Sequence, residues 1–359
     1  MSEKNNRGCS ASVNTGETMD KQINRLMTVE KLETIYEPYQ VEQVQGKSHN
    51  LLDRENLVNI IKLARPRTWF FIYYSYIIGW ILGGPEITSR FILGLTICVL
   101  STANVNLLNA YTDIEEDQVN LPNRVMMVDR LGMSNLRNLT ILLYGFTTGL
   151  VLLMPFWFKV VYIASVFDTV FYSLEPLRLK ARPLMSMISF SGAVLLPGVA
   201  SWTLNNNLVN TPPLLYFLGY MFFTYCTLKN LPDYDGDKLS SLRTSATVFK
   251  TRKQAGKIAA AVLASPFLLL AGLLYSGQLG QQYALLYILA PLVLCLGNLA
   301  IKGDSYEELE KLHTYGLMYV VLFLVITLVI TSPTVMAGVF IVATLALQAL
   351  ILKNKVDSR

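Results

Sequence analysis

Apolar runs of bilayer-spanning length recur along this chain of 359 residues and constrain its fold more than any other feature. A transmembrane helix needs about 20 consecutive, mostly apolar residues. Ten runs come close to that length, at about 68–84, 90–111, 136–156, 158–174, 185–203, 213–229, 256–276, 281–301, 314–331 and 334–352. The chain is 52% hydrophobic and 15% charged, a balance that does not suit a soluble domain of this size. The sequence therefore predicts an all-α, polytopic membrane bundle of nine to ten transmembrane helices around a central cavity.

The distribution of Lys and Arg between the predicted loops indicates the orientation of this bundle. If the N-terminus is cytosolic, the cytosolic loops carry most of these residues, whereas the opposite side holds only Arg90 and Lys159. Such an asymmetry is typical of membrane proteins, whose cytosolic loops are positively charged. Residues 1–55 are polar and contain no apolar signal segment, so we expect a disordered cytosolic tail ahead of a transmembrane domain over 56–355.

Two acidic clusters stand at the ends of apolar runs. In the first cluster, a spacing of four residues puts Asn109, Asp113 and Asp117 on one helical face. In the second, Asp233 and Asp237 have the same spacing if the helix continues. Carboxylates near hydrocarbon are costly, and two such faces turned toward each other suit Mg²⁺, which prefers a few carboxylates plus phosphate oxygens. The clusters therefore predict Mg²⁺-dependent diphosphate chemistry at the cytosolic membrane face.

Simpler interpretations of the acidic residues exist. Both clusters could be solvated helix ends. We expect Glu115 and Glu116 to point elsewhere on the helix and to be solvated. Asp235 lies off the i, i+4 face and is either a bystander or a residue that supports the metal ligands. A Ca²⁺ loop of the EF-hand type is excluded, because no further acid follows Asp237 at the required distance. A histidine-based metal site is not expected either, since His49 and His313 are the only two histidines.

A basic loop follows the fourth apolar run. Arg178 and Lys180 could neutralise a diphosphate leaving group, or they could be cytosolic anchoring charges. The same choice applies to Arg65, Arg67, Arg124 and Lys229.

Two further residues of the fourth apolar run could serve function. Tyr172 adjoins the polar motifs and could face a carbocation, which aromatic rings attract. Asp168 is an acid inside the same run and is a functional candidate for that reason.

These motifs together resemble the UbiA superfamily of membrane prenyltransferases. The first cluster is similar to the family's N-x-x-x-D-x-x-x-D motif and is followed by an N-x-P-x-R segment ending at Arg124. The second resembles a K-D-x-P-D-x-x-G-D motif, and the loop from Tyr172 to Lys180 resembles the family's basic loop. Asn230 departs from the second motif, which usually has an acid there, and the tenth apolar run exceeds the family's usual nine helices.

The resemblance implies transfer of a prenyl group from a polyprenyl diphosphate to an aromatic or other lipophilic acceptor, with Mg²⁺ as cofactor. It implies that the enzyme works within the lipid bilayer and binds no nucleic acid. It assigns metal binding, diphosphate binding and catalysis to three sets of residues, respectively Asp113, Asp117, Asp233 and Asp237; Asn109, Arg124, Lys229 and Arg65; and Arg178, Lys180 and Tyr172.

Two alternatives remain open from the sequence. Asn230 leaves room for a terpene cyclase of the same superfamily, which acts on a prenyl diphosphate without an acceptor. A secondary transporter or membrane scaffold is the alternative from another class. Transporters place ionisable residues near the bilayer midplane, whereas these acids gather at one face. Neither prenyl chain length nor the identity of the acceptor follows from the sequence.

Overall fold

The computed structural model describes residues 50–239, 241–303, 305–354 and 356. The chain divides into two units, 1–48 and 49–359. The predicted disordered tail therefore lies outside the described residues, apart from its last few positions. The first described helix is α2 (Arg54–Leu63).

Within the described residues, all regular structure is helical, as predicted. Each predicted apolar run coincides with a long helical segment. These segments are α3 (Trp69–Leu82), α4 (Ser89–Thr112), α7 (Met133–Val151), α8 (Phe156–Ser173), α9 (Pro183–Trp202), α10 (Pro213–Lys229), α12 (Arg252–Tyr275), η4 (Gln281–Leu289) continued by α13 (Ala290–Lys302), α14 (Tyr306–Thr331) and α15 (Val335–Lys353).

Five of the described helical segments are long and apolar enough to cross a membrane, by length and composition. They are 89–112, 183–202, 252–275, 281–302 and 307–331. Large apolar side chains such as Leu142, Phe146 and Leu268 are exposed on the surface, as expected of a surface that faces lipid. The chain is thus an integral membrane protein with a helical bundle, although the count of nine to ten spans stays a prediction.

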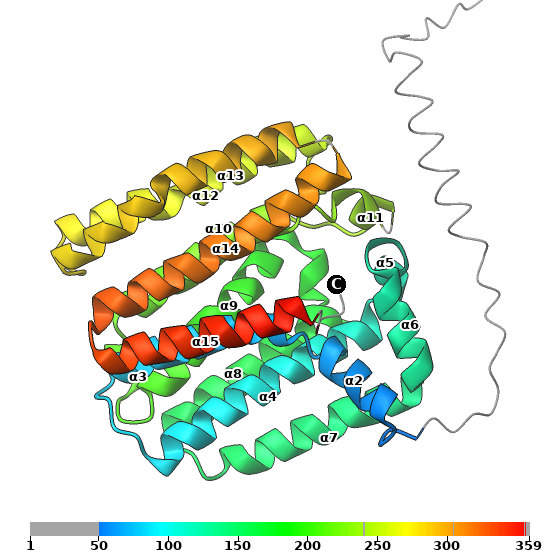
Figure 1. The fold of residues 1–359 in the computed structure, drawn as a ribbon, viewed down its shortest axis with the longest axis horizontal. Coiled ribbons are helices and arrows are strands. Elements are labelled where there is room, and N and C mark those ends of the chain that lie inside the picture. The colour runs from blue at the N-terminus through cyan, green and yellow to red at the C-terminus, as the bar shows by residue number, and fades with distance from the viewer. Residues whose placement is uncertain (1–49, 240, 304, 355, 357–359) are drawn as a thin grey trace, which may run out of the picture. The chain divides into compact units, whose positions relative to one another are not determined.

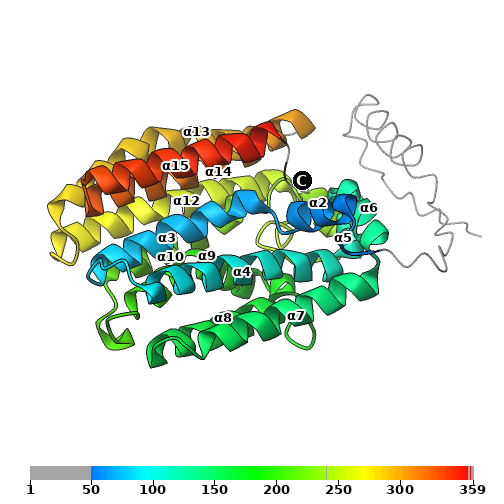
Figure 2. The same cartoon turned by 60° about the horizontal axis from the view of Figure 1, so that its bottom comes forward.

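The long helices run side by side, and short helices gather at one end of the bundle (Figures 1 and 2). Besides α2, these short helices are α5 (Ile114–Asn120), α6 (Pro122–Leu131) and α11 (Tyr234–Leu239). Short 3₁₀ turns lie at η1 (Pro66–Thr68), η2 (Leu179–Ala181) and η3 (Leu208–Asn210). Because α4 and α10 both end where α5 and α11 begin, both acidic clusters come to the same end of the bundle.

Glycine permits close backbone approach at two helix crossings. A Cβ on Gly79 would lie 2.0 Å from the Gly198 carbonyl oxygen, so α3 and α9 pack almost backbone to backbone. A Cβ on Gly256 would lie 2.0 Å from the Ala300 oxygen, which brings α12 against α13 in the same way. Small residues at such crossings allow the van der Waals packing that drives helix association in lipid.

Candidate active site

The first acidic cluster keeps its helical register across a break in the helix. Helix α4 ends at Thr112, and Asp113 (φ −103°, ψ 22°) links it to α5. The amide of Asp113 still donates to the Asn109 carbonyl at 3.0 Å, and the amide of Asp117 donates to the Asp113 carbonyl at 2.8 Å. The backbone hydrogen bonds between residues four apart are therefore kept across the break. Asn109, Asp113 and Asp117 stay in helical register with one another.

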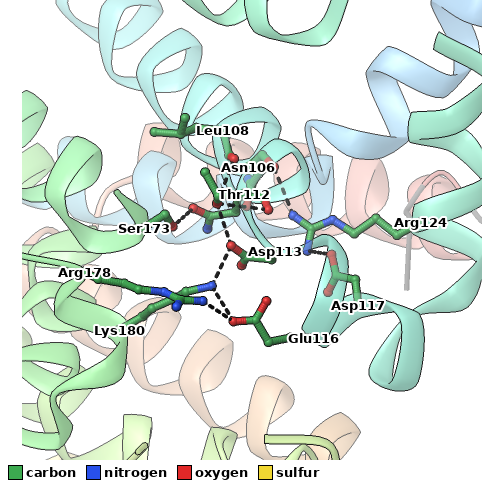
Figure 3. A network of polar contacts seen from close by, with 11 residues as sticks. Asn106, Leu108, Thr112, Asp113, Glu116, Asp117, Arg124, Ser173, Arg178 and Lys180 are labelled. Carbon is green, nitrogen blue, oxygen red and sulfur yellow. Dashed lines mark hydrogen bonds and ion pairs between the residues drawn. The ribbon is translucent and has the colours of Figure 1, made fainter. Parts of the chain in front are cut away.

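The basic loop after α8 reaches directly into this cluster. Lys180 Nζ lies 2.8 Å from Asp113 Oδ1 and 3.0 Å from Glu116 Oε1, while Arg178 Nη2 lies 2.7 Å from the same Glu116 oxygen. Figure 3 shows both cations entering from one side of the two carboxylates. The Lys180 side chain is 6% exposed, so its charge is neutralised by protein groups and not by water.

A third cation reaches the cluster from the opposite side. Arg124, on α6, lies 2.8 Å from Asp117 Oδ2 and donates to the Asn106 carbonyl at 3.1 Å (Figure 3). Ser173, at the end of α8, donates its hydroxyl proton to Asn109 Oδ1 at 2.8 Å. These contacts tie together α4, α5, α6 and the α8–α9 loop around the first motif.

The expectation for Glu116 was wrong. Its side chain is buried instead of solvated and contacts both Lys180 and Arg178. Its i, i+3 spacing from Asp113 was the signal that could have placed it on the same face. Glu115 is exposed, as expected.

The second acidic cluster lies on a separate short helix. Helix α10 ends at Lys229, and α11 begins at Tyr234, so the helix restarts instead of continuing. The Asp237 amide donates to the Asp233 carbonyl at 2.9 Å, which preserves the i, i+4 spacing. Asp237 is buried, whereas the Asp235 side chain is 77% exposed and pairs with Arg252 at 3.3 Å. Asp235 therefore points away from the site and is a bystander, one of the two possibilities that the sequence left open.

The two acidic clusters face each other across a short distance. Helices α5 and α11 pack against one another. The Glu116 carboxylate is near enough to Asp237 to contribute to the raised pKa of that carboxyl. No three Asp, Glu, His or Cys side chains among the described residues converge closely enough to hold a metal ion by themselves.

Two of the predicted basic residues have unusual backbone conformations. Arg65 (φ 51°) and Arg178 (φ 35°) are in the left-handed region, which costs a side-chain-bearing residue about 1–3 kcal/mol. Such strain is found most often at functional sites, because the surrounding contacts must hold it in place. The observation makes both residues stronger candidates than their charge alone.

A cavity of about 240 Å³ opens between α3, α4, α8, α9, α10 and α14. Six residues that the sequence offered as candidates line it, namely Arg65, Arg67, Asn109, Asp168, Tyr172 and Lys229. Farther from the short helices its wall is largely apolar and includes Ile97, Phe158 and Leu196. Lys229 Nζ lies 5.4 Å from the centre of the Phe190 ring, within range of a cation–π interaction. Sequence reasoning did not select His313, which also lines the cavity.

Burial shifts the pKa values of the acids at this end. It raises the pKa of Asp117 to about 6, although Arg124 opposes the shift. Burial, aided by the neighbouring Asp233, raises the pKa of Asp237 to about 7. Burial also acts on Glu116, but Lys180 and Arg178 outweigh it and hold the pKa of that carboxyl below its usual value. Asp117 and Asp237 thus carry negative charge that the protein stabilises only in part.

These shifts predict opposite pH effects on stability and metal binding. Asp117 and Asp237 hold protons more firmly when folded than when unfolded, so lowering the pH from about 8 to about 5 should raise the melting temperature of the metal-free protein. Mg²⁺ needs the deprotonated acids, so its stabilising effect should shrink over the same range. Thermal unfolding in EDTA measures the first effect, and the increase in melting temperature on adding Mg²⁺ measures the second. In Asp237→Asn, both quantities should depend less on pH. A melting temperature in EDTA that falls as the pH is lowered would contradict the raised pKa values of Asp117 and Asp237.

Comparison with known proteins gives a consistent result. The sequence model of the UbiA prenyltransferase family matches residues 69–313. The digeranylgeranylglyceryl phosphate synthase of Sulfolobus acidocaldarius is 26% identical over 246 residues, which are 66% of this chain and 86% of that protein. The bacteriochlorophyll synthase 34 kDa chain of Chloroflexus aurantiacus is 26% identical over 201 residues, 52% of this chain and 63% of that protein.

A solved structure shares the fold. The UbiA homolog from Archaeoglobus fulgidus bound to GPP and Mg²⁺ superposes with a TM-score of 0.57 at 17% identity, covering 76% of this chain and 99% of that one. At this level of identity the likeness establishes the helical architecture.

Proposed function

The chain belongs to the UbiA prenyltransferase family, and from that membership we propose how it transfers a prenyl group. It is a prenyltransferase, like its named relatives. The donor is a polyprenyl diphosphate, the acceptor is a lipophilic molecule, and the reaction depends on Mg²⁺ and releases diphosphate. An aromatic acceptor is our first choice, because the second acidic motif resembles that of family members that prenylate aromatic rings.

One observation carries this proposal: charged and polar groups gather at one end of the bundle, next to an apolar cavity. They include the buried acids Glu116, Asp117 and Asp237. From the same end, Arg65, Asn109 and Lys229 contribute polar side chains to the cavity wall. A prenyl diphosphate has the same two-part character, with a highly charged head and a hydrocarbon tail. The charged end suits the head, and the wall around Ile97, Phe158 and Leu196 suits the tail. The solved homolog bound to GPP and Mg²⁺ supports the same pairing of fold and ligand.

The donor set fits Mg²⁺. All candidate ligands are oxygen atoms, from Asp113, Asp117, Asp233 and Asp237, with Asn109 beside them. The raised pKa values of Asp117 and Asp237 reflect negative charge that a cation would neutralise. Mg²⁺ is usually bound through one or two carboxylates together with substrate phosphate oxygens, so a site that lacks a three-carboxylate cluster suits it.

The side chains of the site have separate tasks in the proposed reaction. Bound Mg²⁺ would supply Lewis-acid stabilisation of the diphosphate. Lys180 and Arg178, now paired with Asp113 and Glu116, donate hydrogen bonds to the leaving diphosphate once substrate brings its own negative charge. Arg65, Arg124 and Lys229 add positive charge around the head, and Asn109 orients it. The Tyr172 ring lies beside the allylic carbon, where it stabilises the developing cation.

The proposed orientation in the membrane rests on the distribution of charge. The acidic clusters and the basic loop share one end of the bundle, and the positive-inside rule puts that end in the cytosol. Residues 1–55 then form a cytosolic tail, and 56–355 form the catalytic membrane domain.

The terpene cyclase alternative gains little from the position of Asn230. Its side-chain amide is buried and donates to Ser245 Oγ at 2.9 Å, so Asn230 acts as a packing and hydrogen-bonding residue beside the second cluster. This arrangement gives no reason to expect a reaction without an acceptor.

Product analysis of the purified full-length protein in lipid nanodiscs tests the proposal. Prenyl diphosphates of several chain lengths are supplied with and without a panel of lipophilic acceptors. We expect acceptor-dependent release of diphosphate and a prenylated product by mass spectrometry. Excess EDTA should reduce the rate at least about 100-fold, and Mg²⁺ should restore it.

Other outcomes would point elsewhere. Turnover that persists in EDTA would refute the metal requirement. A cyclic hydrocarbon formed from prenyl diphosphate alone would establish the cyclase alternative.

A further inference from the structure

Asp168 has no role in the chemistry described so far, yet its position is costly. It lies inside α8, in an apolar segment, and its side chain lines the central cavity. An ionisable residue inside a membrane helix is rare unless a partner or a function requires it. No described Lys or Arg pairs with Asp168.

The two carboxylate oxygens of Asp168 have different surroundings. Ser189, on α9, donates its hydroxyl proton to Oδ1. Oδ2 lies beside Gly192, where an added Cβ would come within 3.1 Å of it. Among the described residues no donor reaches Oδ2, and the atom stays accessible on the cavity wall. Ser189 thus holds the carboxylate in place, and the small Gly192 leaves room for its second oxygen.

Other hydroxyl groups line the cavity around Asp168. Ser165 and Thr169 are on the same helix, and Ser101 lies on α4. The Ser101 hydroxyl is buried and has no hydrogen-bond partner among the described residues. A hydrocarbon tail cannot form hydrogen bonds with these acceptors and hydroxyls, so packing against them leaves them unsatisfied at a cost in free energy. A ligand with its own polar group can form those hydrogen bonds.

The depth of Asp168 matches the place where two substrates must meet. Asp168 precedes Tyr172 by four residues on α8, so it lies on the same face about 6 Å deeper into the bundle. Tyr172 lines the same cavity as Asn109, and its neighbour Ser173 donates to Asn109 at 2.8 Å, so Tyr172 lies beside the place where the diphosphate head is proposed to bind. The first carbons of the prenyl chain, next to the diphosphate head, would therefore lie beside Asp168.

We propose that Asp168 is the recognition site for the acceptor and that the acceptor carries a hydroxyl group. Oδ2 accepts a hydrogen bond from that hydroxyl and holds the nucleophile beside the first carbon of the prenyl chain. Ser189 and Gly192 position the carboxylate. This inference rests on the proposed function and narrows its acceptor class to phenols and alcohols.

Equilibrium binding to the full-length protein in nanodiscs tests the inference. Mg²⁺ and geranyl thiolodiphosphate, a poorly reactive donor analogue, fill the donor site. The acceptor probes are 4-octylphenol and 1-octanol, each compared with its methyl ether. The wild-type protein should bind at least one hydroxyl probe tenfold or more tightly than its ether, because the ether cannot donate to Oδ2.

Variants then test whether the preference for hydroxyl probes over their ethers depends on Asp168. Asp168→Leu removes both oxygens at similar size and should bring the affinities of alcohol and ether within about twofold of each other. Gly192→Ala crowds Oδ2 and should weaken hydroxyl binding but not ether binding. Asp129→Leu, at an exposed acid on α6, is the matched control and should keep the wild-type preference.

Three results would overturn the inference. One is a wild-type protein that does not favour either hydroxyl probe, including one that binds neither. The second is an Asp168→Leu protein that keeps the preference. The third is an Asp168→Leu protein that loses affinity for the donor analogue as strongly as for the hydroxyl probes, which would indicate a structural role. Failure of wild-type protein to bind the donor analogue with Mg²⁺ would instead count against the proposed function.

Discussion

Replacing Asp113 with Asn should abolish prenyl transfer while leaving the protein folded. Asp113 contacts Lys180 directly, and its carbonyl accepts a hydrogen bond from the Asp117 amide, the next acid of the motif. Asn keeps the size of the side chain but removes the charge that a divalent cation requires. We expect turnover to fall at least about 100-fold, the scale seen when one preorganised electrostatic contact to a transition state is lost. Initial rates of diphosphate release measure the effect.

The control for this prediction is Asp235→Asn. It makes the same chemical change on α11 at a side chain that is 77% exposed. Its rate should stay within about twofold of wild type, since surface ion pairs contribute little. Near-normal turnover by the Asp113→Asn protein, with normal expression and melting temperature, would refute the metal-binding role.

Replacing Lys180 with Met should produce the second large loss, with a different signature. Lys180 is buried between Asp113 and Glu116, and the proposed reaction needs its charge on the leaving diphosphate. We expect a loss of about 100-fold or more in turnover. Removing one partner of a buried ion pair also leaves the acids uncompensated, so the metal-free protein should lose about 3 kcal/mol of stability.

Metal binding separates the two variants. Without diphosphate, the Lys180 ammonium competes with Mg²⁺ for Asp113, so Lys180→Met should bind Mg²⁺ at least as tightly as wild type. Asp113→Asn should bind it more weakly. Lys253→Met, at an exposed lysine on α12, is the control and should change neither activity nor Mg²⁺ affinity. Weakened Mg²⁺ binding in Lys180→Met would argue that Lys180 organises the acids and does not compete with the metal.

The acids Asp235 and Glu116 illustrate where the sequence predicts the surroundings of a side chain and where it does not. Asp235 was correctly placed off the metal-binding face, since its position off the i, i+4 face follows from helix geometry alone. The structure decided that it is a bystander and not a residue that supports the metal ligands. Glu116 was misjudged, because its burial comes from Lys180 and Arg178, which lie more than 60 residues farther along the chain. Local periodicity carries no information about such a partner.

The sequence by itself determined the helical class, the membrane setting and the order of the motifs. Apolar run length and the spacing of four between acids are local properties, and a helix translates them directly into spans and faces. Only the tertiary structure decided which charges meet. Helix crossings close enough to require Gly79 and Gly256 set how the bundle packs, and that packing brings Lys180 to Asp113 and leaves the Oδ2 atom of Asp168 open to the cavity. Charge and hydrogen-bond partners depend on distances through space, and no linear pattern encodes those.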